Sequence, residues 1–218
     1  ASRGDVLWAP GVEAVRIDLL DGRTQWSEHL RGVNVVLHLA GVAHRPHTNA
    51  STYREVNVEA TAHLAAAAAR EGVARLVFVS SISVYGCSGG AGKLDETTPL
   101  APKDAYGQSK VDAERAIAFA AEGGGMAWVV VRPPLVYGPN APGNFQRLVG
   151  LVRSGLPLPL STARALRSYV GLDNLVSAVD AVLRAPFNGV VASRLAQAGE
   201  RVGIDVKLME VVDPRELE

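Results

Sequence analysis

The segment Tyr106-Gly107-Gln108-Ser109-Lys110 places a phenol and an amine four residues apart at the start of a predicted helix. Residues i and i+4 lie on one face of a helix, so Lys110 can stand close to the hydroxyl of Tyr106. A cation there favours phenolate and draws the pKa of the tyrosine down from about 10. Tyr106 could then exchange a proton with a substrate hydroxyl. Alone, this spacing is more often that of an unrelated surface pair.

Small hydroxyl side chains follow an apolar segment upstream of that helix. Arg75 to Ser81 is almost continuously apolar, which is typical of a buried parallel strand. Ligands of open α/β sheets bind at the carboxyl ends of the strands, so Ser81 could orient the same substrate oxygen as Tyr106. We expect the hydroxyls of Ser80 and Ser83 to bond with backbone at the strand end. For Ser83 a contact with the substrate stays open as well.

Apolar and helical periods alternate along the chain, which predicts an α/β fold with a doubly wound parallel sheet and right-handed crossovers. We expect residues 1–140 to form a dinucleotide-binding domain and residues 141–218 a small C-terminal substrate-binding lobe, partly interleaved with it. From Val190 to Gly199 there is only a weak helical pattern. The predicted strands are Val12 to Asp18, Val33 to Ala40, Arg75 to Ser81 and Ala127 to Arg132, and the predicted helices are Thr52 to Glu71, Ala105 to Glu122, Asn144 to Ser154 and one that begins near Asp173.

The N-terminal sequence differs from the usual start of a dinucleotide-binding fold. A dinucleotide-binding fold opens with a strand and a glycine-rich turn whose amides hold the pyrophosphate, and no such turn is found in the sequence. The opening residues Ala1 to Gly4 suit the end of a second strand instead. The first strand and its helix, about 30 residues in a βαβ unit, are therefore expected to be missing from this sequence.

Charge and hydropathy exclude several classes of partner. Lysine plus arginine number 22 and aspartate plus glutamate also 22, so there is no basic surface of the kind that nucleic acid or anionic membranes select. No uncharged apolar run reaches the roughly 18–20 residues that span a bilayer, and no signal peptide is evident. Cys87 is the single cysteine and cannot form an internal disulfide. We expect a cytoplasmic protein.

Several motifs in the same order resemble the extended short-chain dehydrogenases/reductases, and within them the NAD-dependent epimerase/dehydratase family that acts on nucleotide sugars. The likeness spans about residues 12–185. It implies that Ser81 positions the substrate, Tyr106 is the acid and base, and Lys110 supports both the tyrosine and the nicotinamide ribose of a Rossmann-like fold. The motifs are Leu39-Ala40-Gly41, Asn57-Val58, Val79 to Gly86, Tyr106 to Lys110 and Arg132 to Pro139.

The resemblance also implies NAD as the cofactor, and Arg3 leaves NADP open because arginine can favour a 2′-phosphate. Its implied cofactor contacts are Asp18 and Leu19 at the adenine, with Leu39, Ala40, Gly41, Asn57, Val79, Tyr106, Lys110 and Pro133.

On the substrate side, the resemblance implies that Asn144 and Arg167 hold the diphosphate of a UDP-hexose or UDP-N-acetylhexosamine. A helix N-terminus suits anions, and a guanidinium matches phosphate oxygens. An ordinary N-cap role for Asn144 and a solvated surface position for Arg167 remain alternatives. A homodimer is implied as well.

Two other functions stay open: an extended reductase of a non-nucleotide carbonyl substrate, and a non-catalytic dinucleotide-binding scaffold. A metal site is not expected, because His38, His44 and His47 have no evident acidic third ligand. The absence of a Gly-x-Ser-x-Gly elbow argues against a serine hydrolase. The sequence does not separate epimerisation from dehydration or reduction.

Overall fold

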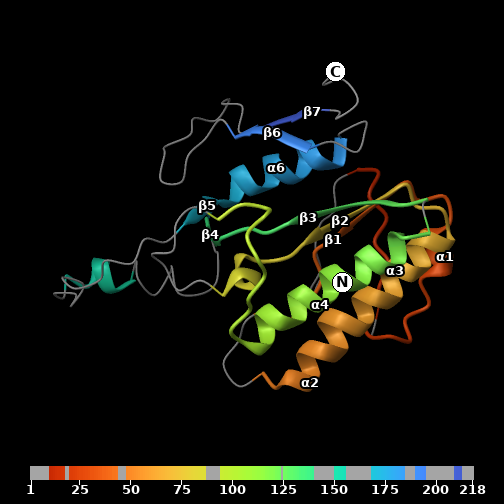
Figure 1. Ribbon diagram of the computed structural model, residues 1–218, viewed down its shortest axis with the longest axis horizontal. Helices are drawn as coiled ribbons and strands as arrows, with labels where there is room; N and C mark the ends of the chain where they lie inside the picture. The colour runs from red at the N-terminus through yellow and green to blue at the C-terminus, as the bar shows by residue number, and fades with distance from the viewer. Residues whose placement is uncertain are drawn as a thin grey trace. The chain divides into compact units, whose positions relative to one another are not determined.

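A computed structural model describes most of the chain, in two compact units (Figure 1). The first unit comprises Ala1–Val79 and Pro102–Val130, and the second comprises Ser80–Ala101 and Val131–Glu218. The described residues are 10–17, 20–43, 48–86, 94–123, 125–139, 150–155, 168–184, 190–194 and 209–212.

A three-stranded sheet with the order β1-β2-β3 organises the first unit. Its strands are β1 (Val35–His38), β2 (Arg75–Val79) and β3 (Ala127–Val131). Strands β1 and β2 are parallel, with Val35 opposite Arg75 and His38 opposite Phe78. The apolar runs predicted as strands at these three places are confirmed, each with shorter bounds.

The strand predicted from Val12 to Asp18 is wrong for the residues described there. Residues 12–17 form no regular structure, and Val12 and Val15 remain about half exposed. A strand needs a neighbour for its backbone hydrogen bonds, and no described strand pairs with this segment. An apolar run alone does not supply that neighbour.

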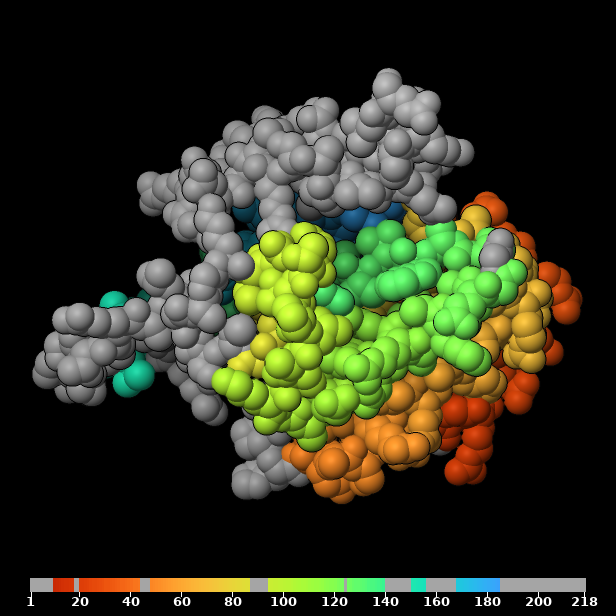
Figure 2. Space-filling view, viewed as in Figure 1, coloured from red at the N-terminus to blue at the C-terminus, as the bar shows by residue number. Residues whose placement is uncertain are grey.

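Helices cover the sheet of the first unit. Helix α1 (Ser27–Leu30) is short, and the single helix predicted from Thr52 to Glu71 is divided into α2 (Ala50–Tyr53), the π-helical turn η1 (Arg54–Glu59) and α3 (Ala60–Arg70). Helix α4 (Ala105–Ala121) matches its prediction to within a residue. Figure 1 shows α3 and α4 side by side, and Figure 2 shows α4 in green against the orange α2–α3 segment.

Side-chain caps and a glycine explain where these helices begin and end. The Oδ1 atom of Asn49 accepts from Thr52 N at 2.9 Å before α2, and that of Asp104 accepts from Gly107 N at 2.7 Å before α4. After α3, Gly72 has φ of 75°, a left-handed conformation that glycine adopts without strain.

Apolar side chains from α3, α4 and β2 form one core cluster in the first unit. Its helix residues are mostly alanine, which lets the backbones approach closely, and its larger members include Leu76, Phe78 and Ile117. This packing fixes α4 against β2.

The second unit contains two small two-stranded sheets. Strands β4 (Leu135–Tyr137) and β5 (Tyr169–Gly171) are parallel, and α6 (Leu172–Arg184) follows β5 where a helix was predicted to begin. Strands β6 (Val190–Arg194) and β7 (Met209–Val212) are antiparallel, so the described residues 190–194 form a strand where the sequence showed only a weak helical pattern. Residues 190 and 191 are both valine, and such β-branched residues favour strands.

The helix predicted from Asn144 to Ser154 is described only near its end, where residues 150–153 are helical. Within the described ranges no helix has the length and apolar character needed to cross a bilayer.

Replacing Ile117 by alanine tests the packing of α4. Ile117 is fully buried, so Ile117→Ala should lower the free energy of unfolding by about 2–5 kcal/mol through lost contacts and a residual cavity. Phe119 on the same helix is 75% exposed, and Phe119→Ala should change it by no more than about 0.5 kcal/mol. Urea unfolding of both variants measures this difference, and equal losses would contradict the described orientation of α4.

Candidate active site

Lys110 is buried at the carboxyl end of β2. Its side chain is 6% exposed, and Nζ donates to the carbonyl oxygen of Val79 at 3.1 Å. The same nitrogen lies 4.6 Å from the centre of the Phe78 ring, a cation–π contact. The structure thus brings the predicted residues Lys110 and Val79 into direct contact at the strand end where α/β sheets bind ligands.

Burial lowers the pKa of Lys110 from 10.5 to about 8, and the nearby carboxylate of Glu114 acts in the opposite direction. Glu114 follows Lys110 by one turn of α4 and is itself 5% exposed. Lys110 therefore remains mostly protonated near pH 7 but can lose its proton under mildly alkaline conditions.

His38 on β1 lies beside this lysine and is uncharged at neutral pH. Burial and the charge of Lys110 lower the pKa of His38 to about 4. Its Nε2 atom forms a hydrogen bond with Thr61 Oγ1 at 2.8 Å, and its ring stacks on Phe78. His44 and His47 lie outside the described residues.

Tyr106 occupies the first turn of α4, one turn before Lys110, and is partly buried. Its ring lies 5.9 Å from that of Tyr53 at a tilt of 58°. The helical spacing predicted for Tyr106 and Lys110 is therefore present in the structure.

The turn after β1 meets both Asn57 and Lys110. A methyl group at Gly41 would lie 2.9 Å from Asn57 Oδ1 and 3.8 Å from Lys110 Nζ, so only glycine fits without displacement. Asn57 is buried in η1, accepts from Val42 N at 2.7 Å and donates to Val42 O at 3.1 Å. Leu39 and Ala40, which precede this turn, lie just beyond the end of β1, with Leu39 63% exposed.

Ser81, Ser83 and Pro133 come together in the second unit. Ser81 caps the 3₁₀ turn η2 (Ile82–Tyr85), where its Oγ accepts from Ser83 N at 3.2 Å and donates to Ser83 Oγ at 3.1 Å. The carbonyl oxygen of Pro133 accepts from Ile82 N at 3.0 Å. A local hydrogen bond was expected for the Ser80 hydroxyl, but this buried group has no partner among the described residues.

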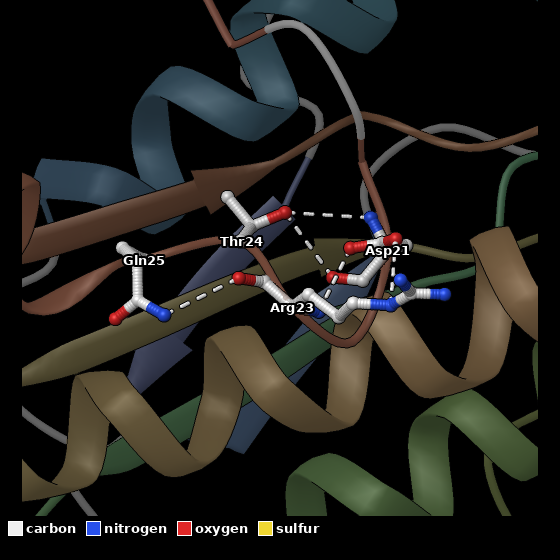
Figure 3. A network of polar contacts seen from close by, with 4 residues as sticks. All are labelled: Asp21, Arg23, Thr24 and Gln25. Atoms are coloured by element: carbon white, nitrogen blue, oxygen red, sulfur yellow. Dashed lines mark hydrogen bonds and ion pairs between the residues drawn. The ribbon is translucent and has the colours of Figure 1, made fainter.

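Four predicted contacts, Asp18, Leu19, Asn144 and Arg167, lie outside the described residues. The loop after Asp18 and Leu19 is described: the Oδ1 atom of Asp21 accepts from Arg23 N at 2.7 Å, and the Thr24 hydroxyl donates to the Asp21 carbonyl at 3.2 Å (Figure 3). An aspartate followed by glycine is a recognisable sequence signal for such an Asx turn, and the sequence interpretation missed it.

Sequence reasoning also missed Glu114 and the contacts of Tyr85. Glu114 could have been found from its spacing of four residues after Lys110. The Tyr85 hydroxyl accepts from Arg132 at 2.8 Å and donates to the Asp95 carbonyl at 3.0 Å, so it links η2 to both residues. No local pattern in the sequence connects these three residues.

Residues 2–195 match the model of the NAD dependent epimerase/dehydratase family. The chain belongs to this family. The UDP-glucose 4-epimerase of Vibrio cholerae is 37% identical over 166 residues, which are 73% of this chain and 51% of that protein. The dTDP-glucose 4,6-dehydratase of Streptomyces griseus is 31% identical over 185 residues, 83% of this chain and 52% of that protein. The chain thus spans about half the length of these relatives.

Solved structures confirm the predicted Rossmann-like α/β fold. MoeE5 in complex with UDP-glucose and NAD is 30% identical, with a TM-score of 0.65 over 75% of this chain and 56% of that one. DesIV, the dTDP-glucose 4,6-dehydratase from Streptomyces venezuelae with NAD and TYD bound, is 29% identical, with a TM-score of 0.62 over 72% of this chain and 50% of that one.

We expect Lys110 to titrate near pH 8, well below the ordinary 10.5. Replacing Glu114 by glutamine should lower this pKa further, because the carboxylate favours the ammonium form. The control Asp112→Asn alters an exposed carboxylate that pairs with Arg115 on the same helix, and should leave the pKa of Lys110 unchanged. NMR of ¹³C-labelled lysine can follow this titration, since the sequence has only four lysines. Titration of Lys110 near the ordinary 10.5 would contradict its buried position.

Proposed function

We propose that this protein is an NAD-dependent epimerase or dehydratase that acts on a nucleotide sugar by hydride transfer at a sugar carbon. The observation that carries this proposal is the buried ammonium group of Lys110, which donates to the Val79 carbonyl at the end of β2. Lys110 lies one helical turn after Tyr106, and the chain belongs to this family. A charge is costly to bury, and such groups are concentrated at functional sites.

The residues around the turn after β1 fit the cofactor. Gly41 has no side chain where a methyl group would collide with Asn57, so the turn can lie close to Asn57 and beside Lys110, which offers a donor next to it. We assign the remaining cofactor contacts to Asp18 and Leu19 at the adenine and to Leu39, Ala40, Val79 and Pro133. NAD is favoured because both MoeE5 and DesIV were solved with NAD.

Tyr106 serves as the acid and base in this proposal. Its phenolate takes the proton from a sugar hydroxyl and later returns it, and the Lys110 ammonium stabilises that phenolate and can donate to the ribose. Ser81 orients the hydroxyl through a hydrogen bond, and Ser83 supports it. Bound NAD would supply the hydride chemistry at the sugar carbon.

The proposed substrate is a UDP-hexose or a UDP-N-acetylhexosamine. Both the Vibrio cholerae UDP-glucose 4-epimerase and the UDP-glucose complex of MoeE5 support a uridine nucleotide. In this proposal Asn144 and Arg167 bind the diphosphate, residues 1–140 carry the cofactor contacts and residues 141–218 the diphosphate contacts. The same proposal includes that the protein forms a homodimer.

A second candidate is a reductase of a non-nucleotide carbonyl compound. The 3beta-hydroxysteroid-dehydrogenase/decarboxylase isoform 1 of Arabidopsis thaliana is 30% identical over 155 residues, which are 70% of this chain and 35% of that protein. Its substrate class has no diphosphate. Contacts to that group therefore separate the two candidates.

Tyr106→Phe should lower kcat for UDP-sugar turnover at least about 100-fold, because general acid–base catalysis contributes that much or more. Tyr53→Phe is the matched control, since this ring packs against Tyr106 and its hydroxyl makes a long contact of 3.5 Å with Ala43 O. Chromatography of UDP-glucose and UDP-N-acetylglucosamine incubated with the full protein and NAD measures turnover. A Tyr106→Phe protein that keeps its function would instead support a non-catalytic scaffold.

Replacing Asn144 and Arg167 by alanine should raise KM for the UDP-sugar about tenfold or more, because each lost charge-assisted hydrogen bond contributes about 1.5–3 kcal/mol. Arg115→Ala is the control, because this arginine is exposed on α4 and pairs only loosely with Asp112 at 3.5 Å. Unchanged KM in the double variant, together with turnover of a sterol ketone, would favour the second candidate.

A further inference from the structure

Ser109 connects three segments of the first unit that are far apart in the sequence. Its side chain is 4% exposed, and Oγ donates to the carbonyl oxygen of Tyr106 at 2.7 Å. The same oxygen accepts from Nδ2 of Asn57 at 3.0 Å. Asn57 in turn holds both backbone groups of Val42. A chain of hydrogen bonds therefore runs from the turn after β1, through η1, to the first turn of α4.

The direction of these bonds sets the orientation of the Asn57 amide. The single proton of Ser109 is used by the Tyr106 carbonyl, so toward Asn57 the hydroxyl can only accept. Nδ2 must then face Ser109 and Val42 O, which leaves Oδ1 to accept from Val42 N. Both amide protons have partners, and Asn57 is only 2% exposed, so removing the Ser109 oxygen would leave a buried donor unsatisfied.

The connections return to Lys110. Ser109 precedes Lys110 on α4, and a methyl group on Gly41, which precedes Val42, would lie 3.8 Å from Lys110 Nζ. The turn after β1 and the lysine amine are thus neighbours in space and are joined through Asn57 and Ser109. A shift of the turn relative to α4 would change the surroundings of the amine.

We propose that Ser109 is a positioning residue that holds the Gly41–Val42 turn and Lys110 in one fixed arrangement through Asn57. This inference rests on the proposed function, in which the turn and the lysine contact the same cofactor. Without the Ser109 hydroxyl, Asn57 turns to recover a hydrogen bond and carries Val42 with it. The cofactor contacts of the turn and of Lys110 are then no longer aligned.

Two readouts test this inference in the full protein: the titration of Lys110 followed by NMR, and the affinity for NAD measured by calorimetry. In Ser109→Ala, the pKa of Lys110 should rise from about 8 toward 10.5 as water reaches the amine. The titratable groups beside this amine are Glu114 on α4, whose carboxylate raises the pKa of Lys110, and His38 on β1, which is uncharged at neutral pH. The substitution changes neither group. The Kd for NAD should rise about tenfold, which corresponds to about 1.4 kcal/mol.

Ser177→Ala is the matched control. Ser177 also donates to a helix carbonyl one turn back, Asp173 O at 2.9 Å, but it is exposed on α6. Neither readout should change in this variant. Ser109→Thr keeps the hydroxyl and should restore both values. If Ser109→Ala does not fold, Ser109→Cys replaces it, because a thiol is similar in size but a much weaker hydrogen-bonding group.

Wild-type values of both the Lys110 titration and the NAD affinity in Ser109→Ala, with only a lower melting temperature, would overturn the inference, since a merely structural serine gives that result. Failure of the proposed function looks different. If the wild-type protein binds no NAD, the assigned cofactor is wrong, and the Lys110 titration in Ser109→Ala still decides whether Ser109 positions the amine.

Discussion

A lysine ammonium buried at the end of a strand is the constraint on which the rest of this structure depends. Removing a charge from water costs several kcal/mol unless nearby groups compensate. Lys110 receives that compensation from the Val79 carbonyl, the face of Phe78 and the carboxylate of Glu114. Since these partners come from β2 and α4, the helix has to be held at a fixed depth against the sheet.

Packing in the apolar core sets the position of α4 against the sheet, and the polar residues beyond the core align α4 with the turn after β1. Small alanine side chains in α3 and α4 allow the helices to pack closely, while Phe78 extends from the core to the amine. The π-helical turn η1 interrupts the preceding helix and carries the buried Asn57, which bonds with Val42 and Ser109. Single π turns are often found at functional sites, where one additional residue re-aims a side chain.

The sequence predicted the parts of this site that depend on local patterns. Helix α4, with Tyr106 and Lys110 one turn apart, was predicted from its helical spacing, and β2 from its almost continuous apolar run. The strand prediction for the segment from Val12 was wrong because strand formation depends on a neighbouring strand that the segment's own residues do not specify. The bond between Asn57 and Ser109 joins residues 52 positions apart, which no periodicity can indicate. The resemblance implied a cofactor role for Asn57, which stays a prediction, while the structure describes its bonds to Val42 and Ser109.

A crystal structure of the full protein with NAD and a UDP-sugar bound is the measurement that tests the central claim most directly. The account predicts that Lys110 Nζ lies within hydrogen-bonding distance of the nicotinamide ribose, with the Tyr106 hydroxyl directed at the sugar hydroxyl whose carbon faces the nicotinamide ring. A nicotinamide bound away from the end of β2, or a Lys110 amine that contacts neither the ribose nor the space beside Tyr106, would contradict it.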